Sequence, residues 1–464
     1  MRDPYSYSAA GHLWFNHEWL SEVIDALVFN GLGVFGLKLL KLCVVAITIA
    51  FVALAESEPD TLALAQLSVL VVSAVAIIPD MQFRPQIFSF ALFSILMFIL
   101  ARDTYRRGAA LWIAIPVLAL WANLHGGFIM GIAALGAYTC ASAACDWMRG
   151  DGLRRSAGLG AITIGATGAT LLTPYGIGTW IVVGHALNNP YTRVAVADWQ
   201  PLFRFLADSD SRSAGILLYN ALPLGLMVAL PVAVAISRDF TDLPMLAVSA
   251  VMCAAAIVAM RNVPFAIIAI ASPLARHGAI ASSRFGLSAA SGEASEAPRA
   301  NLMTQLLLVL AAFALLVETG LFSNRLTARE KYPAGAIAFM RSHDLHGNIL
   351  DNFLWGEYLI WHMSPGSEVF IDGRYDTVYP QDVLRAFMLF HFDQPGADAI
   401  LARWPHDYVM LSPNDLANRV IARHPEWKLI YRDHDTLLYA RAGSAAAKIA
   451  GVPIEGVNPP TAFP

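Results

Sequence analysis

Repeated apolar runs of bilayer length constrain the fold of this chain more than any other feature of its sequence. The runs lie at about residues 33–55, 62–78, 86–100, 109–122, 127–145, 156–172, 214–236, 243–260, 264–275 and 302–322. A helix needs about 20 predominantly apolar residues to cross a bilayer, so the shorter runs must extend into the polar residues beside them. Only 14% of the 464 residues are charged, whereas soluble domains carry about 25%. The sequence therefore predicts an all-α polytopic membrane bundle with about ten transmembrane helices.

Basic residues in the connecting loops orient these helices. One loop carries Arg102, Arg106 and Arg107, and the second loop after it carries Arg149, Arg154 and Arg155. The positive-inside rule places both loops in the cytoplasm. The N-terminus and all residues after Phe322 then lie outside, as do the connections at residues 79–85, 123–127, 174–212 and 261–262.

The pattern changes after the last apolar run, where strands alternate with helices. We expect helices at 336–342 and 382–389 and strands at 348–350, 369–371, 408–411, 427–431 and 436–439. This alternation indicates a small extracytoplasmic α/β domain. The expected division is an outer juxtamembrane segment at 1–32, a transmembrane bundle at 33–322 with a cytoplasmic linker near 276–300, the α/β domain at 325–442, and a disordered tail at 443–464.

A concentration of titratable groups precedes the first apolar run. Residues 11–22 hold two histidines and two glutamates between aromatic residues, and Trp14 and Trp19 are among these aromatics. One interpretation is an amphipathic helix at about 18–30, ending at Gly31 and lying in the headgroup region with both tryptophans as anchors. The other is a polar site on the outer surface that faces a lipid-linked substrate.

Further polar residues fall in the outer connections of the same topology. They are Arg84 before Pro85, His125 in the run Asn123-Leu124-His125-Gly126-Gly127, Asp198, and the pair Arg261-Asn262. Each alone is more often an ordinary loop residue, but their location on one side of the membrane favours a shared cavity. Guanidinium groups bind phosphate in a fork, and an imidazole such as that of His17 or His125 can donate to it.

A sugar acceptor hydroxyl needs a carboxylate as general base. Asp3, Glu18 and Glu22 are the nearest candidates, and Asp198 is a second choice. Such a carboxylate could alternatively hold a divalent cation, Mg²⁺ or Mn²⁺, through its oxygens.

Several other functions are disfavoured. His17-Glu18 is no zinc protease motif, because Ser21 stands where the second histidine is needed. The sequence contains no Walker A loop and no GxGxxG, and a net charge of −4 gives no reason to expect nucleic acid. The four cysteines all fall in apolar runs, which is typical of small buried residues.

Two segments of the α/β domain carry candidate site residues. These are residues 352–361, which contain Glu357, and 370–376, which contain Asp372 and Arg374. The loop after the strand could present Asp372 and Arg374 to a ligand. An Asp–Arg pair that holds the loop is the slightly favoured alternative.

These motifs together resemble bacterial polytopic GT-C superfamily glycosyltransferases of the RgtA/B/C/D-like, mannosyltransferase-related kind. The resemblance rests on residues 3–8 (DPYSYS), 14–22, 83–86 (FRPQ), 121–128 (WANLHGGF), 355–359 (WGEYL) and 371–374 (IDGR), and it extends from Asp3 to about Arg441. It implies inverting transfer of a sugar from a polyprenyl-phosphate donor to a glycan or lipid acceptor outside the bacterial inner membrane, with an acidic catalytic residue in the first outer loop.

The chain departs from that family at its start. Relatives usually begin with one more membrane helix and an acidic segment containing Trp and His, whereas this sequence starts at Met1-Arg2. We therefore expect either a start codon further upstream or a chain that lacks the usual base. A non-catalytic transport, assembly or scaffold protein for envelope polysaccharide, with a degenerate glycosyltransferase fold, is the alternative function.

Overall fold

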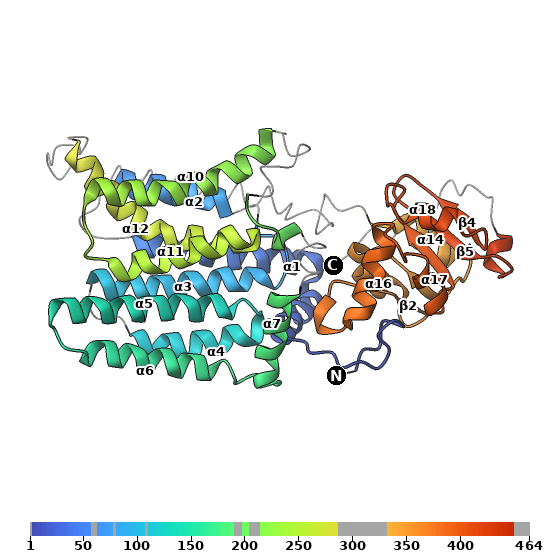
Figure 1. The fold of residues 1–464 in the computed structure, drawn as a ribbon, viewed down its shortest axis with the longest axis horizontal. Helices are drawn as coiled ribbons and strands as arrows, with labels where there is room; N and C mark the ends of the chain where they lie inside the picture. The colour runs from blue at the N-terminus through green and yellow to red at the C-terminus, as the bar shows by residue number, and fades with distance from the viewer. Residues whose placement is uncertain are drawn as a thin grey trace. The chain divides into compact units, whose positions relative to one another are not determined.

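The computed structural model describes residues 2–56, 63–77, 80–106, 110–189, 197–203, 214–285 and 332–449. The chain divides into two compact units (Figure 1). The bundle unit comprises His17–Trp180 and Val196–Phe322, and the C-terminal unit comprises Met1–Asn16, Ile181–Ala195 and Ser323–Pro464. Each unit is described by itself.

The bundle unit consists of long apolar helices. They are α1 (Trp19–Glu56), α2 (Ala63–Ile77), α3 (Gln86–Arg106), α4 (Ala114–Leu124), α5 (Phe128–Arg149), α6 (Arg154–Ala169), α10 (Ala214–Ser237), α11 (Leu243–Val258) and α12 (Val263–Arg284), while α7 (Ile177–Asn188) runs across the unit boundary. Within the part of the chain that the structure describes, four segments are long and apolar enough to cross a membrane, namely Trp19–Ala55, Gln86–Arg106, Phe128–Arg149 and Met260–Arg284. The prediction of a largely helical, membrane-type chain is confirmed, whereas the run at 302–322 lies outside the described residues.

The first helix follows the expected division closely. The sequence predicts a break at Gly31 between a surface helix and the first span, and α1 (Trp19–Glu56) consists of two helical segments that meet at a kink at Gly33. Its only non-helical backbone among these residues is at Gly33, with φ 61° and ψ −152°. Glycine alone adopts this conformation readily because it has no Cβ. The predicted break between two helical segments is thus confirmed, displaced by two residues from Gly31 to Gly33.

Helix α12 forms the centre of the bundle and packs against α10, α11 and α2. Phe265 of α12 contacts the rings of Phe90, Phe93 and Trp121 at centroid distances of 5.1 to 6.2 Å. The contacts with Phe90 and Phe93 are edge-to-face and the contact with Trp121 is stacked, and both arrangements add to the energy of apolar burial. The helices are therefore fixed relative to one another by a well-packed interior.

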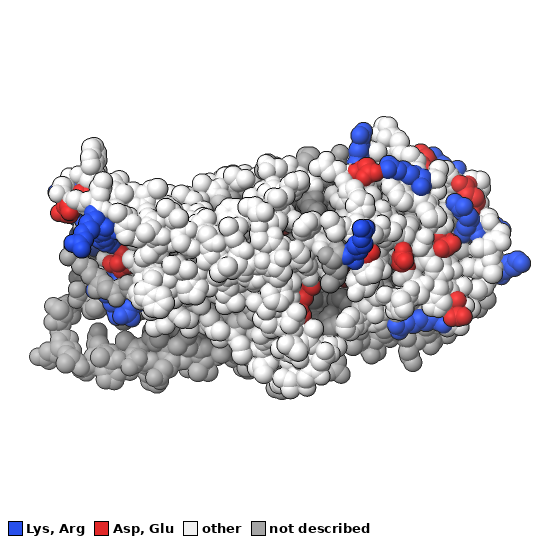
Figure 2. Space-filling view, turned by 90° about the horizontal axis from the view of Figure 1, so that it is seen from below, with Lys and Arg blue, Asp and Glu red and all other residues white. Residues whose placement is uncertain are grey.

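Polar groups gather at the two ends of the bundle. At the end formed by the last turns of α3 and α5, Arg155 pairs with Asp103 at 2.6 Å and Arg276 pairs with Asp239 at 2.8 Å. Figure 2 shows that the visible flank of the helices is almost free of charged side chains, which gather at this end. An uncharged flank between polar ends is typical of a membrane-spanning bundle.

The C-terminal unit contains a five-stranded mixed sheet. The strands are β1 (Gly347–Leu350), β2 (Ser367–Val369), β3 (Tyr408–Leu411), β4 (Trp427–Arg432) and β5 (Leu437–Arg441), in the order β2-β1-β3-β5-β4. β1 pairs in parallel with β2 and β3, and β5 pairs antiparallel with β3 and β4. Strands are thus found in each of the five places predicted from the sequence.

Helices cover both faces of this sheet. They are α14 (Ala334–Ser342), α15 (Gly356–Met363), α16 (Gln381–His391), α17 (Ala399–Arg403) and α18 (Asn418–Ala422). Ile349 and Met410 face the α14–α15 side, whereas Leu350 and Val409 face the α16–α17 side. Because successive strand residues point to opposite faces, the two apolar layers are built by alternate residues. The α/β prediction is confirmed, although the sequence analysis missed α15, α17 and α18.

Residues 2–16 belong to the C-terminal unit rather than to the expected juxtamembrane segment 1–32. The amide of Val369 donates to the carbonyl oxygen of Tyr5 at 3.0 Å, and the amide of Phe15 donates to the carbonyl oxygen of Thr377 at 3.2 Å. Ser6 forms a parallel bridge with Val369. The edge strand β2 has backbone groups without a neighbouring strand, and the extended N-terminal segment satisfies some of them.

Candidate functional site

The candidate site lies at the end of the bundle where α1, α3 and α12 begin. Glu18 immediately precedes α1, Arg84 precedes α3, and His125 lies between α4 and α5. Arg261 belongs to the short 3-10 helix η5 (Met260–Asn262) between α11 and α12. The structure brings these four residues, far apart in sequence, to one end of the bundle unit.

Glu18 lies between two histidines. Its Oε1 atom is 3.4 Å from Nε2 of His125 and 3.6 Å from Nε2 of His17. About 27% of the Glu18 side chain is exposed, so the carboxyl group can be reached while protein surrounds most of it. This burial raises the pKa of Glu18 to about 7, although the charge of Arg261 acts in the opposite direction. A carboxyl that titrates near neutral pH suits proton transfer.

His125 is almost fully buried. Burial lowers the pKa of His125 well below its usual value, and the charges of Arg261 and His17 lower it further. The imidazole is therefore neutral near pH 7, and its contact with Glu18 is a polar contact rather than an ion pair. The sequence analysis expected His125 to bind a donor phosphate, whereas the structure directs its Nε2 atom at the Glu18 carboxyl.

Neighbouring side chains position the start of α1. The indole N–H of Trp19 donates to Oδ1 of Asn123 at 3.0 Å. The amide nitrogen of Asn123 in turn donates to the carbonyl oxygens of Ala119 at 2.8 Å and Leu172 at 2.9 Å. Asn123 thereby links α1, α4 and the segment after α6, and it holds the residue next to Glu18 in place.

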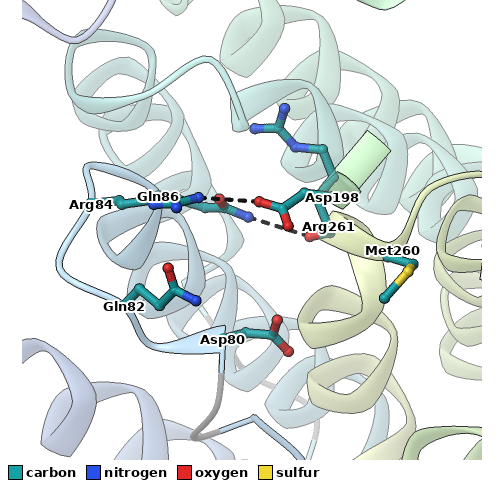
Figure 3. Close-up of a pocket in the computed structure, with 7 residues that line it drawn as sticks. All are labelled: Asp80, Gln82, Arg84, Gln86, Asp198, Met260 and Arg261. Atoms are coloured by element: carbon teal, nitrogen blue, oxygen red, sulfur yellow. Dashed lines mark hydrogen bonds and ion pairs between the residues drawn. The ribbon is translucent and has the colours of Figure 1, made fainter. Parts of the chain in front are cut away.

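Two arginines border a polar recess beside these groups. Figure 3 shows the lining residues, which are Asp80, Gln82, Arg84, Gln86, Asp198, Met260 and Arg261. The empty space, including its opening to solvent, is about 480 Å³. Gln86 donates to the carbonyl oxygen of Arg261 at 3.4 Å, which joins the start of α3 to η5.

The arginines differ in their surroundings. Arg84 pairs with Asp198 at 3.1 Å, and about half of each side chain is exposed. The guanidinium of Arg261 lies over the Trp199 ring, 4.3 Å from its centroid. An exposed ion pair contributes little to stability, so Arg84 can exchange Asp198 for an anionic ligand. Because a face of the Arg261 guanidinium stacks on Trp199, its N–H groups can donate hydrogen bonds from the edge of the group.

Three other predicted residues are separate from the contacts of the Glu18 carboxyl and the recess. Asp3 is in the C-terminal unit, where it accepts hydrogen bonds from the amides of Tyr5 and Ser6. Glu22 is one turn further along α1 and is exposed. Asn262 donates to the carbonyl oxygen of Ala255 at 3.0 Å, which fixes the end of α11.

The soluble-domain candidates form a second polar cluster, centred on Arg374. Its Nε and Nη2 atoms bind the two oxygens of Asp372 at 2.9 and 2.5 Å, and Nη1 binds Asp3 at 2.7 Å. The guanidinium also lies over the rings of Tyr5 and Trp14, at 5.2 and 4.9 Å. All three guanidinium nitrogens are occupied within the unit. This geometry favours the interpretation of Asp372 and Arg374 as a pair that holds the loop.

Glu357 and Asp372 are brought together by two glycines. The amide of Gly373 donates to Oε1 of Glu357 at 2.6 Å. A Cβ on Gly356 would clash with the carbonyl oxygen of Ile371 and with Asp372. Helix α15 therefore approaches the loop more closely than any larger residue at position 356 would allow. The sequence segments 355–359 and 371–374 therefore form one structural unit.

Ser89, Trp121 and Trp199 complete the bundle site and were not selected from the sequence. Ser89 and Trp121 are fully buried, and each stands in a continuous apolar run. Nothing in such a run separates a polar residue of a site from one that bonds its own helix. In the sequence, the only signal at Trp199 is that it is an aromatic residue next to the charged Asp198.

The divalent cation expected from the sequence finds no obvious ligand set. Across the described residues, no group of three or more His, Cys, Asp or Glu side chains is arranged to hold a metal ion.

Fold and site together define a class: a multi-pass helical membrane bundle with a C-terminal α/β domain and a polar site at the helix ends. The sequence matches no protein-family profile and no curated protein. Two crystal structures of ArnT from Cupriavidus metallidurans, one bound to undecaprenyl phosphate and one in the apo state, are similar in fold. Their identities are 12% and 13% and their TM-scores 0.51 and 0.50, covering 96% of this chain and 92% and 91% of theirs.

An apo oligosaccharyltransferase from Archaeoglobus fulgidus is also similar, with 12% identity, a TM-score of 0.48, and coverage of 96% of this chain and 68% of that one. The two ArnT structures, at TM-scores of 0.51 and 0.50, carry the comparison. The chain therefore shares its overall fold with the two ArnT structures.

Proposed function

We propose that this protein is an integral membrane glycosyltransferase that moves a sugar from a polyprenyl-phosphate donor to a glycan or lipid acceptor. The observation that carries the proposal is a reachable carboxyl of near-neutral pKa, Glu18, at the same end of the bundle as Arg84 and Arg261. The similarity to an ArnT structure described as bound to undecaprenyl phosphate supports a polyprenyl carrier.

In the proposed reaction, the oxygen of the acceptor hydroxyl attacks the anomeric carbon of the donor sugar. The Glu18 carboxylate takes the proton of this hydroxyl at the same time. The bond between this carbon and the donor phosphate breaks, and the polyprenyl phosphate leaves with the bonding electrons. Arg84 and Arg261 stabilise the charge that develops on the phosphate. Attack opposite the leaving group inverts the anomeric configuration.

Glu18 suits the role of base better than the other candidates do. Asp3 is held by Arg374 and two backbone amides, and Asp198 is paired with Arg84. The carboxylates of Asp3 and Asp198 are thus engaged by cations and amides rather than presented to a substrate. The carboxyl of Glu18, in contrast, lies between two histidines, and burial raises its pKa to about 7.

The proposal includes location and family. We propose that the end with Glu18, and the C-terminal unit, face the extracytoplasmic side of the bacterial inner membrane, an orientation that the basic loops support through the positive-inside rule. Labelling of single introduced cysteines with a membrane-impermeant maleimide tests this orientation.

The motif at 121–128 supports the RgtA/B/C/D-like group within the superfamily.

The test is transfer of labelled sugar from a panel of polyprenyl-phosphate donors by purified protein in lipid nanodiscs. We expect turnover that Glu18→Gln reduces by about 10²–10⁴-fold, the range of general base catalysis. Asp382→Asn is the matched control, because Asp382 forms an exposed ion pair with Arg403 in the C-terminal unit. EDTA with add-back of Mg²⁺ or Mn²⁺ tests the cation requirement.

The alternative, a scaffold or transport protein with a degenerate fold, predicts a different result. Such a scaffold would neither bind the donor lipid nor transfer sugar from any donor, with or without Glu18→Gln. Full activity of Glu18→Gln with a donor that the wild type uses would contradict the role of Glu18.

A further inference from the structure

A buried chain of polar side chains lies behind Glu18. The indole N–H of Trp121 donates to Oγ of Ser89 at 2.6 Å, and Oγ of Ser89 is 2.7 Å from Nδ1 of His125. Trp121 and Ser89 are 0% exposed and His125 is 6% exposed. Buried polar groups persist when they are mutually hydrogen-bonded, so the three side chains hold one another in fixed orientations.

The hydrogen bonds fix the tautomer of His125. The backbone N–H of Gly127 also points at Nδ1, at 3.0 Å. An amide nitrogen can only donate, so Nδ1 acts as an acceptor and carries no proton. Since burial keeps the imidazole neutral, its single proton must be on Nε2.

The protonated nitrogen faces the proposed base. Nε2 of His125 is 3.4 Å from Oε1 of Glu18, a separation that ligand binding could shorten. We infer that His125 is a positioning residue, whose Nε2–H, aimed by Ser89 and the Gly127 amide, orients the Glu18 carboxylate for proton transfer. The catalytic meaning of this pairing rests on the proposed function, whereas the pairing itself does not.

Gly127 is required for this arrangement. A Cβ at this position would lie 2.6 Å from Oγ of Ser89 and 2.8 Å from Nδ1 of His125. Either contact would displace the imidazole or the hydroxyl, because both are buried. The sequence motif His125-Gly126-Gly127 thus combines the positioning side chain with the glycine that lets its partner approach.

Other groups around Glu18 act on the same carboxyl. His17 approaches it at 3.6 Å, and Arg261 lowers its pKa by its charge. On α1, Asp25 interacts with Glu18 and Glu22 electrostatically. Variants of His125 must therefore be compared with a histidine that does not face Glu18, and His434 is suitable because it is exposed in the C-terminal unit.

The first experiment needs no activity. ¹⁵N-labelled histidine in nanodisc-embedded protein gives separate signals for the two neutral tautomers and for imidazolium. We expect a His125 signal, identified by its loss in His125→Gln, with the Nε2–H tautomer at pH 6 to 8. We expect Ser89→Ala to keep the Nε2–H tautomer, because the Gly127 amide still donates to Nδ1. An imidazolium or an Nδ1–H tautomer in the wild type would overturn the inference.

The second experiment follows Glu18 directly. The infrared C=O stretch of its protonated carboxyl, identified by its loss in Glu18→Gln, reports its titration. We expect His125→Leu to shift the midpoint upward by about one unit, since a donor that favours the carboxylate is lost. His125→Gln keeps an N–H donor near this position and should restore most of the shift, while His434→Gln should change nothing.

The two proposals fail in different ways. An unchanged Glu18 midpoint in folded His125→Leu protein refutes the positioning role, whatever the activity. A shifted midpoint in a protein that transfers no sugar from any donor refutes the proposed enzyme and leaves the pairing established. In an active enzyme, the acidic limb of the pH–rate profile should move with the infrared midpoint, whereas a merely structural role would lower the rate without moving it.

Discussion

Glu18 illustrates how a site residue costs stability. A glutamate ordinarily titrates at about 4.3, and burial raises this pKa to about 7 in the folded protein. The folded state therefore binds the proton more tightly than the unfolded state does. Its stability contribution is complete below pH 4 and is lost as the pH rises towards 7. Such destabilisation is common where a group is prepared for chemistry.

The direction of this pKa shift predicts how Glu18→Gln changes the stability of the protein. Glutamine cannot ionise, so the variant avoids the cost of a buried carboxylate. We expect its melting temperature to exceed that of the wild type by a few degrees at pH 8. The two should agree within error at pH 4.5, where Glu18 is protonated. Thermal unfolding in one detergent at both pH values measures the difference, and an equal difference at both would contradict the raised pKa.

At the scale of elements, the kink of α1 depends on one residue. Gly33 has φ 61° and ψ −152°, which residues with a Cβ almost never adopt, while Gly31, two positions earlier, has ordinary helical backbone. The kink separates the first turns of α1, which follow Glu18, from the apolar remainder. The direction in which the helix leaves the site is therefore set by glycine rather than by packing alone.

Gly33→Ala and Gly31→Ala form a matched pair. We expect Gly33→Ala to destabilise the protein by about 1–3 kcal/mol because of backbone strain. Gly31→Ala should be neutral or slightly stabilising, because nothing lies within 4 Å of its added Cβ and alanine favours helix. Melting temperatures of both variants measure the effect. Similar values for the two variants would show that α1 straightens at no cost.

At the scale of the whole molecule, residues 2–16 connect the two units by chain continuity. The segment is fastened to the C-terminal unit through Arg374 and ends with the bond from Phe15 to Thr377. His17 and Glu18 follow directly in the sequence. A structural change in the loop that holds Arg374 can therefore reach the proposed base through a few residues of chain.

Arg374→Lys tests this fastening. Lysine keeps the charge but cannot bind Asp372 in a fork and Asp3 at the same time. We expect faster hydrogen exchange at residues 2–16 and a loss of about 3–5 kcal/mol, because two buried carboxylates lose their partner. Arg403→Lys, in an exposed ion pair with Asp382, is the control and should change neither quantity. Unchanged exchange in Arg374→Lys would contradict the fastening.

The sequence by itself determined the features that depend on local patterns. Apolar runs of bilayer length set the helical bundle, because any such run must hydrogen-bond its own backbone in a membrane. Strands at 348–350 and 408–411 follow from short apolar runs bounded by turn residues. The sequence also placed Glu18, Arg84, His125 and Arg261 in connections at one end of the bundle, because alternating helices return the chain to the same side.

Only the tertiary structure decided what each of these residues does. The pKa of Glu18 and the tautomer of His125 depend on Ser89, Gly127 and Arg261, which distant segments supply. Asp3 is part of the Arg374 cluster and not the proposed catalytic base, because residues 2–16 pair with an edge strand more than 350 positions away. Burial and hydrogen-bond partners are properties of the packed chain, and no local pattern of residues contains them.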